Sequence, residues 1–270
     1  ADLTVVVIGL DSTLEREGLD RDSLELPQQQ RELLATVGAR SRGPVVVVVI
    51  AGASVDLTDT TEYADAVLWA GYPGQDGGRA IGEAIFGKYS PSGRLPITLY
   101  PASLAHRVAL TDMSLRSPPG RTYRFYTEQP VFAFGTGLTY PPVRVAWQRD
   151  GTSDAVHVDT TSSHGISLQV TLQNKGTMAT DYVLLAFASW PNHPSAPLRQ
   201  LVSFQRVTSL HAAETRTVGV VLHTESLSLV DEDGTRWLRG GRVVLTVEGD
   251  TQDLLVQGHD RRVDVEGSET

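Results

Sequence analysis

The N-terminal third of the chain alternates between short apolar runs and amphipathic or polar stretches. Leu3–Leu10 and Val45–Ala51 are continuous apolar runs rich in valine, and Ala66–Ala70 is a shorter one. Such runs are typical of parallel strands that are covered on both faces. Helices are predicted from Pro27 to Gly38 and from Arg79 to Phe86. This alternation predicts an α/β fold with a mostly parallel sheet.

Two stretches of this part lack a clear period. Val55–Thr61 is rich in Asp and Thr and is predicted as a turn region. From Tyr89 to Tyr140, Pro, Gly and aromatic residues are frequent. We expect a long connection that packs on the α/β part, with Leu95–Tyr100 extended.

After about Val143 the pattern changes to short alternating segments separated by turn residues. This spacing predicts an all-β sandwich of about seven strands. The clearest segments are Ile166–Leu172, Val183–Ala188, Leu201–Val207, Thr215–Leu222 and Arg242–Val247. The predicted organisation is a partial α/β domain over 1–118, a connecting segment over 119–150, the sandwich over 151–258 and a mobile tail over 259–270.

Composition removes several classes of function. With 23 basic and 32 acidic residues the net charge is 23 − 32 = −9, which argues against nucleic acid as a partner. The chain has no cysteine, and its seven histidines do not form the spacings of zinc sites. No apolar run approaches the roughly 20 residues of a membrane span. We therefore expect no metal, no cofactor and no membrane partner.

Four strings of residues together point to a family. They are EGLDRDSLELP (Glu17–Pro27), the long string from YPGQDGG to ITLYP (Tyr72–Pro101), FAFGTGLTY (Phe132–Tyr140) and VTLQNKGT (Val170–Thr177). They resemble the C-terminal part of a family 3 glycoside hydrolase of the β-xylosidase/β-glucosidase type, with a fibronectin type III-like sandwich. The resemblance covers the chain from Ala1 to about Gly258.

The resemblance implies a retaining, exo-acting β-glycosidase that acts on a β-linked oligosaccharide or glycoside. In that family the nucleophile is an Asp on an N-terminal (β/α)8 barrel, which this chain does not contain. We therefore expect a C-terminal portion of the enzyme that is inactive alone and has the barrel domain as its partner. The family also implies an extracellular, secreted location.

Two carboxyl groups are candidates for the acid/base that such chemistry needs. Glu15 and Glu17 both follow the first predicted strand, and ligands gather at the C-terminal ends of parallel strands. Glu17 matches the family's EGxDR pattern, whereas Glu15 is the rival in a Glu-x-Glu pair. Arg21 is expected to clamp the loop through a carboxylate or a carbonyl, or else to form a surface ion pair.

The alternative function is a non-catalytic remnant of the family that binds carbohydrate or protein. Thr136 stands where the family usually has His, and Ala51-Gly52-Ala53 departs from its usual pattern. The glycine-rich Pro73–Gly78 segment is expected to be a tight structural turn. Trp69 is expected in the core, and Trp190 is expected to pack against neighbouring prolines.

Overall fold

A computed structural model of the chain describes residues 1–109, 111–149, 155–159 and 166–263. These residues form two compact units, each described by itself below. Unit 1 consists of Ala1–Tyr89, Arg94–Thr122 and Tyr126–Thr136. Unit 2 consists of Ser90–Gly93, Tyr123–Phe125 and the described residues from Gly137 onward. The predicted fold class, a partial α/β domain followed by an all-β sandwich, is confirmed.

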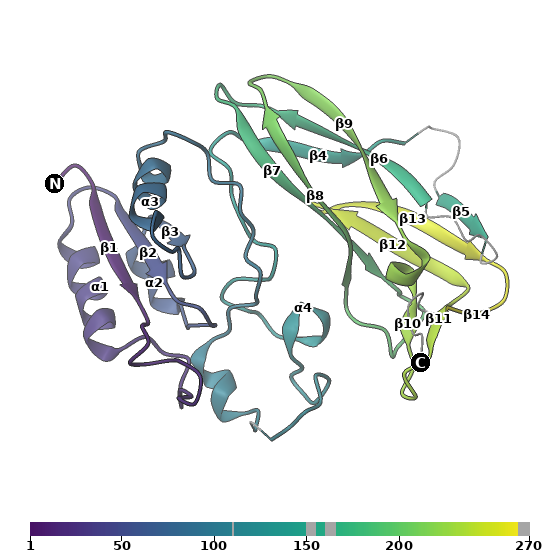
Figure 1. The fold of residues 1–270 in the computed structure, drawn as a ribbon, viewed down its shortest axis with the longest axis horizontal. Helices are drawn as coiled ribbons and strands as arrows, with labels where there is room; N and C mark the ends of the chain where they lie inside the picture. Colours follow the sequence, from purple (N-terminus) through teal and green to yellow (C-terminus); the bar gives the residue numbers. More distant parts are fainter. Residues whose placement is uncertain (110, 150–154, 160–165, 264–270) are drawn as a thin grey trace. The chain divides into compact units, whose positions relative to one another are not determined.

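Unit 1 is built on a small parallel sheet (Figure 1). Its strands lie in the order β1-β2-β3. They are β1 (Thr4–Gly9), β2 (Val45–Ile50) and β3 (Ala66–Trp69). The three predicted strands are thus confirmed, and their C-terminal ends lie at the same edge of the sheet because all three run in parallel.

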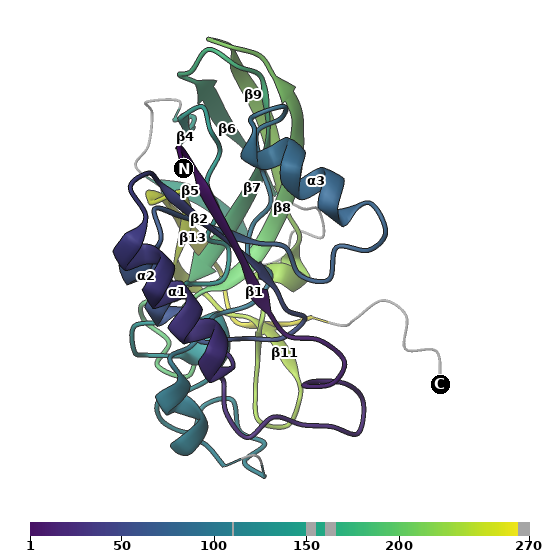
Figure 2. The ribbon, with the colours of Figure 1, turned by 90° about the vertical axis from the view of Figure 1, so that its left-hand side faces the viewer.

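The described helices of unit 1 are α1 (Gln28–Arg40), α2 (Thr58–Tyr63), α3 (Gly77–Ile85) and the 3-10 helix η1 (Ala102–His106). The short helix α4 (Thr122–Phe125) belongs to unit 2 from Tyr123 onward. Helices α1 and α2 lie side by side (Figure 2). Gly38 is needed at their contact, because a Cβ there would lie 2.8 Å from the Cβ of Tyr63. The prediction of a turn region over Val55–Thr61 was wrong, since α2 begins within it at Thr58.

The sheet of unit 1 is covered unevenly. On β1, Val6 and Ile8 are buried against Leu34 of α1 and the rest of the core, whereas Val5 and Val7 are exposed. The expectation that the first strand is covered on both faces was therefore wrong for the described residues. Side chains alternate between the two faces of a strand, so Val5 and Val7 lie on the face opposite to Val6 and Ile8, and the described residues leave that face of β1 largely open.

Unit 2 is a β-sandwich, and its strands come in two main sheets and one small sheet. The five-stranded sheet has the order β5-β13-β12-β7-β8, and the three-stranded sheet has the order β4-β6-β9. The bounds are β4 (Val143–Trp147), β5 (Ala155–Asp159), β6 (Ile166–Asn174), β7 (Thr180–Ser189), β8 (Gln200–Leu210), β9 (Thr215–Leu222), β12 (Gly241–Val247) and β13 (Asp250–Gln257). The small sheet contains β10 (Leu229–Val230), β11 (Arg236–Leu238) and β14 (Arg261–Arg262), with η2 (Thr224–Leu227) before it.

All five segments that the sequence picks out in the sandwich form strands, namely β6, β7, β8, β9 and β12. Leu95–Tyr100 does not form a regular strand, and its one bridge joins Leu99 to Phe132. The segment predicted as a mobile tail, 259–270, contains β14, which pairs with β11. Residues 264–270 of that segment lie outside the described part of the chain.

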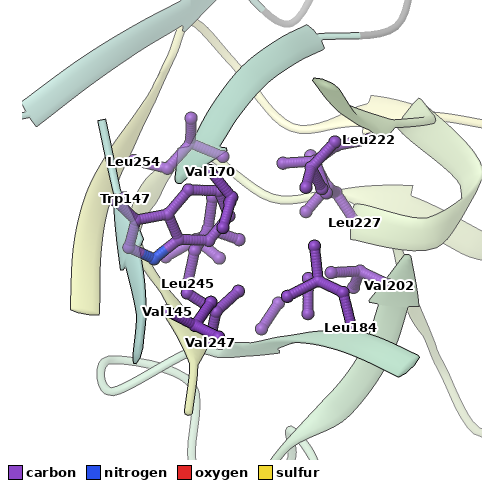
Figure 3. Close-up of a cluster of buried hydrophobic side chains, with 14 of the residues drawn as sticks. Val145, Trp147, Val170, Leu184, Val202, Leu222, Leu227, Leu245, Val247 and Leu254 are labelled. Carbon is purple, nitrogen blue, oxygen red and sulfur yellow. The ribbon is translucent and has the colours of Figure 1, made fainter. Parts of the chain in front are cut away.

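The core of the sandwich lies between its two main sheets. Val170 and Leu222 from the three-stranded sheet and Leu184, Leu245 and Leu254 from the five-stranded sheet belong to one buried cluster. Figure 3 shows these side chains gathered in one layer. Apolar burial of this kind is the main stabilising contribution to such a domain.

We expect Leu245→Ala to destabilise the sandwich by about 2–5 kcal/mol, because a fully buried leucine would leave a cavity. Leu138→Ala is the matched control, since Leu138 is 86% exposed and the same substitution there should cost less than about 0.5 kcal/mol. Urea unfolding of the two variants measures the difference. Equal losses at both positions would contradict the position of this core.

Candidate functional site

The loop after β1 carries both candidate carboxyl groups. It begins at Asp11, whose side-chain carboxylate accepts hydrogen bonds from the backbone N–H and the hydroxyl of Thr13. The backbone carbonyl of the same Asp11 accepts the N–H of Glu15. These local bonds turn the chain sharply at the end of the strand and bring Glu15 back toward the edge of the sheet.

A tight turn follows and places Glu17 at its tip. Arg16 and Leu19 pair across the turn, with the N–H of Leu19 donating to the carbonyl of Arg16 at 2.9 Å. Gly18 has a φ of +74°, a conformation that glycine adopts without strain. Glu17 is exposed, and none of the described residues hydrogen-bonds or ion-pairs with its carboxylate.

Glu15, in contrast, is held by groups from three different loops. Its Oε1 accepts the hydroxyl of Tyr72 at 2.5 Å and the backbone N–H of Gly52 at 3.1 Å. Its Oε2 lies 3.3 Å from Nε of Arg21. Gly52 follows β2 and Tyr72 follows β3, so this one carboxylate joins the loops after all three strands of the parallel sheet.

Arg21 extends the same network. Besides its ion pair with Glu15, it donates to the carbonyl of Ser54 at 2.8 Å and to that of Ser23 at 3.3 Å. The side chains of Arg21 and Glu15 are only 15% and 14% exposed. The predicted clamp is thus confirmed, and it uses both a carboxylate and carbonyls. Asp20, the neighbour of Arg21 in the motif, is exposed.

The network holds Glu15 as an anion. Partial burial acts to raise its pKa, but the hydrogen bonds from Tyr72 and Gly52 and the charge of Arg21 outweigh burial and lower the pKa of Glu15 below its ordinary value. The hydrogen bond to Glu15 likewise raises the pKa of the Tyr72 hydroxyl. Glu15 is therefore a hydrogen-bond acceptor that holds its neighbours in place, whereas no other described residue binds the carboxylate of Glu17.

We expect the stability of the chain to depend on pH through Glu15. Because its folded-state pKa is lowered from the ordinary 4.5, its stabilising contribution is present above about pH 4.5 and is lost as the pH falls through the lower folded-state value. In Glu15→Gln this acid-dependent part of the stability should disappear, which thermal unfolding between pH 3 and 7 measures. Identical acid dependence in both proteins would mean that the network does not hold the carboxylate ionised.

The glycine-rich turn after β3 also has the expected structural character. The N–H of Gly77 donates to the carbonyl of Gly74, which has a φ of +69°. A Cβ on Gly77 would lie 2.5 Å from the ring of Pro73. Gly74 therefore serves the left-handed backbone conformation of the turn, and Gly77, the first residue of α3, serves its close approach to Pro73.

The other titratable residues do not form a metal-binding cluster within the described part of the chain. Among the described residues there is no group of three or more His, Cys, Asp or Glu side chains that could hold a metal ion. Within the described part of the chain, no helix is long and apolar enough to cross a membrane. Trp69 packs against the core of unit 1, as expected. Trp190 is buried in the core of the sandwich, and its packing against neighbouring prolines stays a prediction.

Sequence reasoning missed the role of Gly52 and Tyr72. Their positions in the sequence could have indicated this role. Each lies just past the C-terminal end of a predicted parallel strand, as the loop with Glu15 and Glu17 does. The ends of neighbouring parallel strands converge at one edge of the sheet. That rule could have grouped the three loops, although the individual contacts depend on the folded structure.

Comparison with known families divides the chain in two. A family model described as the glycosyl hydrolase family 3 C-terminal domain matches residues 1–140. A second one, described as a fibronectin type III-like domain, matches residues 182–251. The first match includes the whole Glu15 network, and the second lies in the sandwich.

Curated relatives match over nearly the full chain. The chain is 35% identical over 282 residues to β-xylosidase/α-L-arabinofuranosidase 1 of Medicago sativa subsp. varia. This match covers 95% of this chain and 36% of that protein. It is 37% identical over 261 residues to the exo-1,4-β-xylosidase bxlB of Emericella nidulans, covering 92% of this chain and 34% of that protein. The chain therefore spans about a third of the length of these relatives.

A solved structure agrees with these relatives. The fold is similar to that of a family 3 exo-β-xylosidase in complex with a xylobiose aziridine probe, with a TM-score of 0.91 and 30% sequence identity. The match covers 98% of this chain and 37% of that protein. Here too the chain corresponds to a part of a longer protein.

Proposed function

The chain belongs to glycosyl hydrolase family 3 and corresponds to the C-terminal part of its longer members. We propose that it supplies the acid/base loop of a retaining, exo-acting β-glycosidase. Relatives are named β-xylosidase and α-L-arabinofuranosidase, so a terminal β-linked xylosyl unit is the first substrate to test. Glucosyl and arabinosyl units come next. The nucleophile is expected outside this chain, on the barrel domain that the family resemblance implies.

Glu17 is the proposed acid/base. The observation that carries this assignment is the contrast between the two candidates: Glu15 is held by Tyr72, Gly52 and Arg21, while Glu17 projects from the tip of the turn. A group that donates and accepts a proton in each cycle must be free to contact the substrate. An exposed carboxyl becomes a general acid once burial or a nearby negative charge favours its protonated form. The rest of the active site would supply that environment.

The proposed reaction has two steps. In the first, the nucleophilic carboxylate attacks the anomeric carbon while the protonated Glu17 gives its proton to the glycosidic oxygen, so that the bond to the leaving group breaks. In the second, the ionised Glu17 removes a proton from water as the water oxygen attacks the anomeric carbon of the glycosyl-enzyme. The nucleophile is released, and Glu17 is protonated again.

Glu15 is proposed to position the loop and not to transfer the proton. By joining the loops after β1, β2 and β3 it fixes the start of the turn that carries Glu17. Catalytic groups must be held close to the productive geometry, and a displacement of about 1 Å costs on the order of 10²-fold in rate. A charged, multiply hydrogen-bonded group suits this task, because it restricts three loops at once.

The test is hydrolysis of β-xylosides and β-glucosides by this chain and by a form of the protein extended upstream over the remaining length of its relatives. The proposal expects turnover by the extended protein only, and loss of that turnover in its Glu17→Gln variant. Loss in Glu15→Gln with the kinetic signature of an acid/base would reassign the role to Glu15. An extended protein that cleaves no β-glycoside would favour a non-catalytic module that binds carbohydrate or protein.

A further inference from the structure

Tyr72 combines two properties that seldom occur together: it is exposed, and it is fixed. The residue is 55% exposed. Its hydroxyl is hydrogen-bonded at 2.5 Å to Glu15, which Arg21 and the backbone of Gly52 hold in turn. An exposed tyrosine would normally sample several rotamers, so this arrangement presents an ordered aromatic surface to solvent.

One edge of the ring also lies close against the backbone of Gly52. A Cβ at position 52 would lie 2.5 Å from Cε2 and 3.0 Å from Cδ2 of Tyr72. Any residue other than glycine would therefore force the ring to move. The departure of Ala51-Gly52-Ala53 from the family's usual pattern thus retains the glycine that the ring needs. The hydroxyl is anchored, the ring lies close against Gly52, and more than half of the residue's surface stays open.

We infer that this open surface of Tyr72 is a platform for the leaving-group sugar of the substrate, an inference that rests on the proposed function. One side of a pyranose ring is lined by C–H groups, and such a surface stacks on an aromatic ring with burial of apolar area. A ring that is already ordered loses little conformational entropy on binding. Tyrosine is well suited to this role because its polar end can be anchored while its ring makes the contact.

The leaving-group side follows from the position of the acid/base. Glu17 protonates the oxygen of the leaving group, so residues near Glu17 face that part of the substrate. The hydroxyl of Tyr72 contacts Glu15. Glu15 lies two residues before Glu17, so the Cα atoms of these two glutamates are at most about 7 Å apart. The substrate class is therefore β-linked oligosaccharides, whose leaving group is itself a sugar ring.

The experiment compares two substrates with the extended protein, xylobiose and methyl β-xyloside. Both leaving groups need a proton, but only xylobiose has a sugar ring to stack. We expect Tyr72→Ala to lower the ratio of kcat/KM for xylobiose to kcat/KM for methyl β-xyloside by about 2- to 12-fold. Tyr72→Phe keeps the ring and loses the hydroxyl, and it should retain most of that ratio.

The ratio separates a platform from a structural role. If Tyr72 served only to position Glu15 and the loop, Tyr72→Ala would lower kcat/KM for both substrates together and leave the ratio unchanged, which overturns the platform alone. An extended protein that is inert on both glycosides overturns the proposed function and this inference with it. A ratio that falls as far in Tyr72→Phe as in Tyr72→Ala assigns the effect to the hydroxyl and also overturns the platform.

Discussion

In the extended enzyme, Glu17→Gln is expected to lower kcat/KM for methyl β-xyloside by about 10²- to 10⁴-fold, the range of general acid catalysis. Glutamine keeps the shape of the side chain but cannot give a proton to the departing alcohol. A 2,4-dinitrophenyl leaving group departs without that proton, so kcat/KM for its β-xyloside should fall by less than about 10-fold. Steady-state kinetics on the two substrates measures this difference.

The second step of the reaction, hydrolysis of the glycosyl-enzyme, tests the role of Glu17 independently. Without its general base the variant should accumulate glycosyl-enzyme, and azide should restore turnover because it attacks the anomeric carbon without losing a proton. Glu25→Gln is the matched control: Glu25 lies exposed in the same loop, paired with Arg31 across 3.3 Å, and its loss should change activity less than twofold. Azide rescue of Glu15→Gln instead of Glu17→Gln would contradict the assignment.

The regular elements of unit 1 could be predicted where apolar runs were long and continuous. β2 is the clearest example, with six apolar residues between turn residues. Helix α2 escaped because its sequence, TDTTEY, has no apolar stripe. Its start depends on Asp56, whose carboxylate accepts the N–H and the hydroxyl of Thr58, and such a polar segment is equally typical of a turn.

One strand of the sandwich, β13 (Asp250–Gln257), escaped because its local signal is weak. β13 reads DTQDLLVQ, in which polar residues occupy most of the outward positions and two of the inward ones. Gln252 is one of these, and it is buried. β13 forms its pairs with β12 and β5, so its assignment rests on tertiary partners and not on its own pattern.

The candidate site was predictable as a place but not as an arrangement. Parallel-strand topology put Glu15 and Glu17 at the edge of the sheet where ligands gather. The residues that distinguish the two carboxyl groups are distant in sequence: Gly52 lies 37 positions and Tyr72 lies 57 positions from Glu15. No local pattern records such contacts, and the family motif alone left both glutamates open.

Arg21→Ala is expected to open the loops around Glu15. The guanidinium group contacts the Glu15 carboxylate and the carbonyls of Ser54 and Ser23, so its removal leaves a largely buried carboxylate without its cation. Breaking a fully buried pair costs about 3–5 kcal/mol, and the partial exposure of this one reduces the expected local loss to about 2–3 kcal/mol. Amide hydrogen exchange at Gly52 should then accelerate by roughly 30- to 150-fold, at about 1.4 kcal/mol per factor of ten.

The same substitution should lower kcat/KM of the extended enzyme by about 10²-fold, since the turn that carries Glu17 would lose its fixed start. Arg21→Lys should be intermediate in both measurements, because a single ammonium group cannot reach all three acceptors as the planar guanidinium does. Arg79→Ala is the control: Arg79 is 73% exposed, and its contact with Glu83 is long, at 3.9 Å. If exchange at Gly52 were as slow in Arg21→Ala as in Arg79→Ala, Glu15 would be held by Tyr72 and the backbone alone, and the clamp would have no energetic role in the site.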